Sequence, residues 1–118
     1  MAKFSIKKNI SLIIIFFSII LFDQLTKILV VKNFQLYESM SIFPLFNLTF
    51  VVNYGFAFGF LNNSSLNQII VICVIFSIIA YSLYLLFKTQ DQFFRFSLIL
   101  VLSGAVGNFI DRLIHGFV

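Results

Sequence analysis

The stretch that decides the fold is ISLIIIFFSIILFDQLTKILVV, residues 10–31. As an α-helix it would be roughly 33 Å long at about 1.5 Å per residue, enough to cross the hydrocarbon core of a bilayer. A cleaved signal peptide is the alternative, but it requires small residues at a cleavage site, and FDQLTK offers no A-x-A pattern. We therefore predict a membrane-spanning helix over 10–31, with polar residues in its last third.

The rest of the chain has the same character, because 61% of its 118 residues are hydrophobic and only 10% are charged. A soluble domain of this size has too little interior to bury so many apolar side chains. Two further apolar runs, 69–87 and 93–114, are each long enough to span a bilayer. We expect one integral membrane domain, 1–118, with three spans and a short cytoplasmic turn at 88–92.

The segment 32–67 between the first two spans has mixed polarity. Within it, LFNLTFVV at 45–52 is rich in β-forming residues and has no helical period. The predicted fold class is therefore an all-α transmembrane bundle with a small β-rich lobe between spans 1 and 2.

Basic residues set the expected orientation. One side of the membrane receives Lys3, Lys7, Lys8, Lys88 and Arg95, and the other receives Lys27, Lys32 and Arg112. The side with more positive charge is expected to be cytoplasmic. The N-terminus would then be cytoplasmic, and the lobe 32–67 and the polar motifs would lie at the outer face.

Asp23 and Lys27 are four residues apart, so they share one face of a helix with the acid N-terminal to the base. They could be a neutralising pair, with the lysine extending outward to the interface. They could also line an aqueous cleft between helices, because ionisable residues inside membranes commonly mark sites or pathways.

In VVNYGFAFGFL, residues 51–61, one amide and two glycines stand among aromatic residues. Glycine permits a sharp turn and close backbone approach, so Asn53 and Gly55 could present backbone groups to an extended peptide. A glycine-rich interfacial turn within an aromatic belt is the other interpretation.

The most informative motif is SGAVGNFIDRLIHG, residues 103–116. Ser103, Gly104 and Gly107 can bring a neighbouring helix close. Asn108, Asp111 and Arg112 follow at positions i, i+3 and i+4, so Asp111 could neutralise Arg112 while Asn108 forms hydrogen bonds. A structural polar cluster at a helix end remains the alternative to a binding site.

Other functions lack a sequence signal. No set of His, Cys, Asp or Glu residues has metal-ligand spacing, and there is no phosphate-binding loop or serine–histidine pattern, so we expect no metal and no cofactor. The net charge of +4 comes from basic residues that sit mostly at the ends of apolar runs, so it indicates membrane topology and no nucleic acid partner.

Taken together, DQLTK at 23–27, VVNYGFAFG at 51–59 and GAVGNFIDRLIHGFV at 104–118 resemble the lipoprotein signal peptidases (signal peptidase II). The resemblance implies a monomeric, four-span aspartyl endopeptidase of the bacterial cytoplasmic (inner) membrane, surrounded by membrane lipid. Its substrates would be prolipoproteins, whose signal peptides it removes by cutting before the lipid-modified cysteine.

The resemblance also implies roles for individual residues. The family's motifs surround its catalytic cleft, and they match Asp23, Lys27, Asn53, Gly55, Gly104, Gly107, Asn108, Asp111 and Arg112. Asn53, Asn108 and Arg112 match residues that hold the peptide or support the catalytic pair. Phe56 departs from the pattern, because a small residue is usual there.

The family's two catalytic aspartates are expected beyond Val118, so the catalytic residues are unknown here, and we expect the 118-residue chain to lack the pair and its activity. Two carboxylates that share a proton are needed for this chemistry. Asp23 and Asp111 are poor substitutes, since each has its own cation, Lys27 or Arg112.

Two other classes of protein remain as alternatives to a peptidase. A small polytopic binding or transport protein could handle an ion or lipid with Asp23, Asp111 and Arg112. A structural membrane subunit would not need these positioned polar groups.

Overall fold

The computed structural model describes residues 6–55 and 65–118, with side chains described for 9–55 and 68–118. Several predictions therefore lie outside the described residues, namely those on Lys3, Phe56, Gly59 and the side chains of Lys7 and Lys8. The order of elements is α1 (Ile6–Asn33), β1 (Ser39–Phe43), β2 (Phe46–Thr49), α2 (Ser65–Lys88) and α3 (Gln92–His115).

Three helices, α1, α2 and α3, are each long and apolar enough to cross a membrane. A helix satisfies its own backbone hydrogen bonds, which lipid cannot do, so long apolar runs in a bilayer become helical. The helices extend slightly beyond the predicted spans 10–31, 69–87 and 93–114. The predicted class, a helical transmembrane bundle with a small β element between the first two helices, is confirmed.

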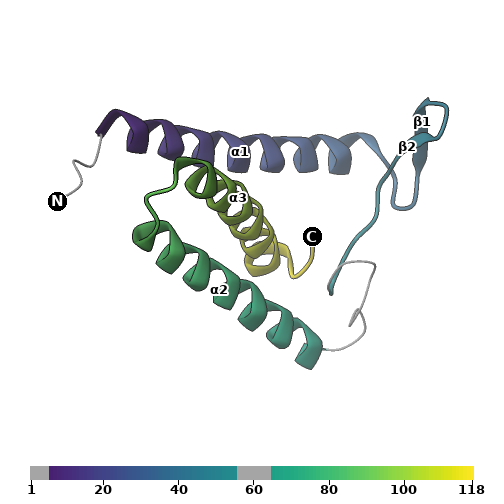
Figure 1. Ribbon diagram of the computed structural model, residues 1–118. Coiled ribbons are helices and arrows are strands. Elements are labelled where there is room, and N and C mark those ends of the chain that lie inside the picture. Colours follow the sequence, from purple (N-terminus) through teal and green to yellow (C-terminus); the bar gives the residue numbers. More distant parts are fainter. Residues whose placement is uncertain (1–5, 56–64) are drawn as a thin grey trace.

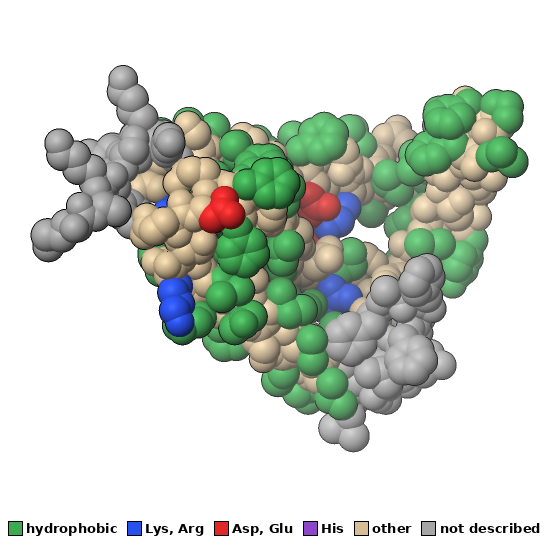
Figure 2. All heavy atoms as spheres, in the orientation of Figure 1, with side chains coloured by type: hydrophobic (Ala, Val, Ile, Leu, Met, Phe, Trp, Pro, Cys, Tyr) green, Lys and Arg blue, Asp and Glu red, His purple; other side chains and the backbone are tan. Residues whose placement is uncertain are grey.

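Helix α3 packs between α1 and α2, and the described parts of α1 and α2 do not contact each other (Figure 1). The core is small and comes from α2 and α3: Val71, Ile75, Leu98, Ile99 and Leu102. Large apolar side chains elsewhere are exposed, and they cover much of the visible surface in Figure 2. Such a surface is stable in contact with lipid, which is as apolar as these side chains.

Caps position both ends of α3. Its first turn is capped by Asp91, whose carboxylate accepts hydrogen bonds from the amides of Phe93 and Phe94 at 2.9 and 3.3 Å. Near that end, Arg95 Nη2 donates to Asn9 Oδ1 on α1 at 2.9 Å. At the other end, Gly116 takes a left-handed conformation with φ 81° and donates to Arg112 O, which ends the helix.

Strands β1 and β2 form an antiparallel hairpin in which Ser39 pairs with Thr49. The pairing continues past the strands, because Tyr37 N donates to Phe50 O and Phe50 N donates to Glu38 O. The strand prediction over 45–52 is correct only in part, since it includes β2 but also Leu45 in the turn and residues 50–52 beyond the strand, and it misses β1. The hairpin lies beyond the end of α1, and residues 51–55 then return toward the end of α3 (Figure 1).

Candidate functional site

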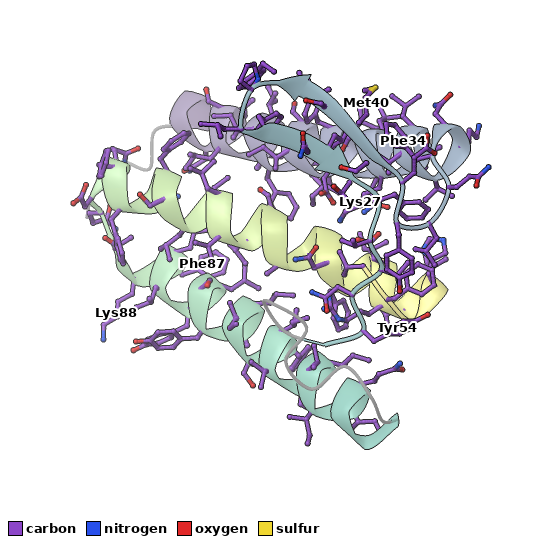
Figure 3. All side chains as sticks on the ribbon, turned by 90° about the vertical axis from the view of Figure 1, so that its right-hand side faces the viewer. Lys27, Phe34, Met40, Tyr54, Phe87 and Lys88 are labelled. Carbon is purple, nitrogen blue, oxygen red and sulfur yellow. The ribbon has the colours of Figure 1, made fainter. Side chains whose placement is uncertain are left out.

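Lys27 stands between two acids at the contact of α1 and α3. Its Nζ lies 2.6 Å from Asp23 Oδ2, one turn earlier on α1, and 2.5 Å from Asp111 Oδ2 on α3. Asn108 Oδ1 accepts a longer hydrogen bond from the same Nζ at 3.4 Å. Lys27 therefore points from α1 toward α3 (Figure 3) and does not extend outward to the interface as an isolated pair with Asp23.

Gln24 completes this cluster, and our reasoning from the sequence missed it. Its Nε2 donates to Asp111 Oδ1 at 3.0 Å, so both carboxylate oxygens of Asp111 are bound by residues of α1. The same Nε2 lies 3.3 Å from Asp23 Oδ2 and 3.5 Å from Gly107 O. Nothing in the local pattern marks Gln24, because its contacts with α3 are with residues more than 80 positions away.

Gly107 allows the two helices to approach this closely. A Cβ atom added at Gly107 would lie 2.7 Å from Asp23 Oδ2. The predicted close approach of a neighbouring helix is therefore found at Gly107, and the Ser103 side chain on the same helix is fully buried. Gly104 does not take part, since a Cβ there would meet no described atom within 4 Å. Gly104 and Gly107 differ by three residues, and only one of them faces α1.

Arg112 joins α3 to the segment that follows the hairpin. Its Nη2 donates to Gly55 O at 2.6 Å, and its Nη1 donates to Asn108 O at 3.2 Å. Gly55 N in turn donates to the side chain of Asn53 at 2.8 Å, which closes a tight turn. Asn53, Gly55, Asn108 and Arg112, which come from two separate sequence motifs, therefore meet.

Asp111 attracts the Arg112 guanidinium electrostatically, as expected, but its direct ion pair is with another cation. In the described part of the chain, Asp111 forms its ion pair with Lys27, and Arg112 binds backbone carbonyls. Neighbouring side chains on a helix do not face each other, and Lys27 reaches Asp111 across the close contact at Gly107. The two aspartates and two cations of the site nevertheless balance in charge.

The end of α3 forms a second backbone connection to this segment. Asn53 N donates to Val118 O at 2.7 Å, and Val118 N donates to Asn53 O at 2.9 Å. The rings of Tyr54 and Phe117 pack edge to face with centroids 5.5 Å apart. The turn at Gly116 makes this possible, because it directs residues 117–118 away from the helix axis toward residue 53.

A cavity of about 570 Å³ opens beside the cluster, between the second half of α1, residues 48–53 and the end of α3. Polar groups reach it from Gln24, Lys27 and Asp111, while its other walls are largely apolar, including Val31, Val52 and Phe117. Figure 2 shows acidic and basic side chains next to each other in a hollow, with hydrophobic side chains around it. An extended, mostly apolar segment with a few polar backbone groups would suit such a cavity.

The polar groups of this cluster are suited to binding a ligand. Residues 6–55 and 65–118 contain no group of three His, Cys, Asp or Glu side chains that could hold a metal ion. The carboxylates of Asp23 and Asp111 have the Lys27 ammonium between them, so they do not face each other as a proton-sharing pair would. The site can orient a ligand through charge and hydrogen bonds.

The comparison with known proteins points to one family. A family model described as signal peptidase (SPase) II matches residues 15–118. The lipoprotein signal peptidase of Pasteurella multocida is 45% identical over 101 residues, covering 83% of this chain and 61% of the relative. That of Shewanella halifaxensis is 45% identical over 101 residues, covering 81% and 58%. The chain thus spans about three fifths of the length of these relatives.

A solved structure of a bacterial membrane enzyme is similar to most of this chain. It superposes with a TM-score of 0.81 at 29% sequence identity, covering 92% of this chain and 66% of that one. The family model and the two relatives, which are each 45% identical over 101 aligned residues, lead to the same conclusion. This chain belongs to the signal peptidase II family.

Proposed function

We propose that this chain forms the signal-peptide-binding part of a lipoprotein signal peptidase, which removes signal peptides from prolipoproteins before the lipid-modified cysteine. Family membership supports the reaction. One observation supports the binding role: the linked polar cluster of Lys27, Asp23 and Asp111 borders an apolar cavity at one end of the bundle.

In this proposal, the apolar walls of the cavity accept the hydrophobic part of the signal peptide. The turn closed by Asn53 and Gly55, with Arg112 beneath it, holds the peptide backbone in an extended form. We further propose that catalysis is of the aspartic type and uses a pair of acids other than Asp23 and Asp111. Asp23 and Asp111 have supporting roles, because each already binds Lys27.

The proposed orientation in the bacterial inner membrane places the N-terminus in the cytoplasm and the cavity near the outer face. Lys88 lies at the end of α2 beside the turn to α3, and Arg95 lies in the first turns of α3. Both are at the opposite end of α3 from Arg112 and the cavity. Counted with Lys3, Lys7 and Lys8, which precede the first span in the sequence, the basic residues expected at that end number five, against three (Lys27, Lys32 and Arg112) at the other, which supports a cytoplasmic location. We also propose that the protein acts as a monomer.

The test is cleavage in detergent micelles by the full-length protein, by which we mean the product of the complete gene that contains this sequence. The substrate is a synthetic prolipoprotein peptide with a diacylglyceryl-modified cysteine, and the matched control peptide carries an unmodified cysteine. We expect mass spectrometry to find a single cut before the modified cysteine and no cut in the control. Ion or lipid transport in liposomes that depends on Asp23, Asp111 or Arg112, with no cleavage, would instead support a transport protein.

A further inference from the structure

The amide of Gln24 lies at the centre of the polar cluster, although it carries no charge. Its Nε2 is within hydrogen-bond distance of Asp111 Oδ1, Asp23 Oδ2 and Gly107 O. All three are acceptors, so the opposite orientation of the amide would place its oxygen against two carboxylates. The chemistry of the surroundings therefore sets the orientation of the side chain.

The cluster needs such a donor, because two carboxylates share one ammonium. Asp23 and Asp111 both contact Lys27 Nζ, so their nearest oxygens are at most about 5 Å apart, and their charges repel. The Asp111 side chain is only 6% exposed, so water does little to screen this repulsion. Gln24 supplies a hydrogen bond to the second oxygen of Asp111 without adding charge.

Arg112 is the competing partner for Asp111. It is the next residue on α3, and its guanidinium is close enough to be attracted electrostatically by the Asp111 carboxylate. If Asp111 turned to Arg112, the guanidinium would be drawn away from Gly55 O, which it binds at 2.6 Å. The turn at residues 53–55 would then lose its support from α3.

We propose that Gln24 is a positioning residue for the peptide-binding turn: by holding Asp111 on the side of α1, it leaves Arg112 bound to Gly55. Gln24 acts through Asp111 and Arg112 and has no direct role in the chemical step. This inference rests on the proposed function for its kinetic consequences, while its structural consequences can be measured without any cleavage.

The first experiment measures cleavage of the diacylglyceryl peptide by full-length Gln24→Met, which keeps the length of the side chain and removes the donor. We expect KM to rise about tenfold, the scale of one lost hydrogen bond to a charged group, while kcat stays within about twofold. The matched control is Gln92→Met, an exposed amide at the other end of α3, which should leave both constants unchanged.

The second experiment follows hydrogen exchange of the backbone amides of residues 53–55 in the same proteins. We expect roughly tenfold faster exchange in Gln24→Met and a larger increase in Gln24→Glu, which adds a third carboxylate. The double variant Gln24→Glu with Asp111→Asn exchanges the acid and the amide, so it should restore much of the protection. A residue that only fills space would show no such reversal.

Unchanged KM and unchanged protection of residues 53–55 in Gln24→Met would overturn the proposal, as would a loss confined to kcat. A double variant no better protected than Gln24→Glu would also contradict it. If the wild-type protein cuts no prolipoprotein peptide, the proposed function fails, and the exchange measurements still decide the role of Gln24.

Discussion

Replacing Gly107 with alanine should separate α1 from α3 at the polar cluster. The new Cβ would lie 2.7 Å from Asp23 Oδ2 and 3.5 Å from Asp23 Cγ. The first distance is well inside the roughly 3.5 Å at which nonbonded atoms attract each other. Asp23 cannot simply turn aside, because its Oδ2 is held by Lys27, which also holds Asp111.

Either the helices move apart or the shared ion pair breaks, and both outcomes resemble overpacking of a core, which costs about 1–3 kcal/mol. We expect Gly107→Ala to lower the free energy of unfolding of the full-length protein by about 2 kcal/mol. The assay is unfolding in mixed micelles with increasing sodium dodecyl sulfate, followed by circular dichroism.

Gly104→Ala is the matched control, since it makes the same change three residues earlier on α3 with no described atom within 4 Å of the new Cβ. Alanine favours a helix over glycine by up to about 1 kcal/mol, so this variant should be at least as stable as the wild type. Equal stability of the two variants would refute the close contact of α1 and α3 at Gly107.

Three further changes test the site. Lys27→Met leaves two acids without their shared cation and should lower the free energy of unfolding by about 2–3 kcal/mol in the same assay. The control Lys32→Met removes an exposed lysine and should lower it by less than about 0.5 kcal/mol. Equal losses in the two variants would contradict the shared ion pair. Arg112→Lys keeps the charge but loses the planar guanidinium group that binds Gly55 O, so KM for the lipid-modified peptide should rise about tenfold. An unchanged KM would argue against the proposed role of the turn. Gly116→Ala places a side chain at φ 81° and should lower the free energy of unfolding by about 1–2 kcal/mol. A stability equal to that of the wild type would mean that α3 can end without a left-handed residue at this position.

Much of this site could be predicted because the sequence carries local signals. Asp23 and Lys27 lie one turn apart on a single helix, so their proximity follows from helical geometry. Asn108 and Arg112 are related in the same way on α3. The choice of partner between helices was less predictable, and the direct ion pair of Asp111 with Lys27 was not foreseen, because that choice depends on which faces of α1 and α3 meet.

Local patterns in the sequence were enough to predict the three apolar helices, the presence of β structure between the first two, and the polar motifs at the ends of two helices. Apolar run length and residue type act over a few turns of chain, so these features are local. Only the tertiary structure decided that Gly107 and not Gly104 faces α1, that Gln24 and Lys27 share Asp111, and that Arg112 binds Gly55. These contacts join residues more than 50 positions apart and depend on how each helix is rotated about its axis, which no local pattern specifies.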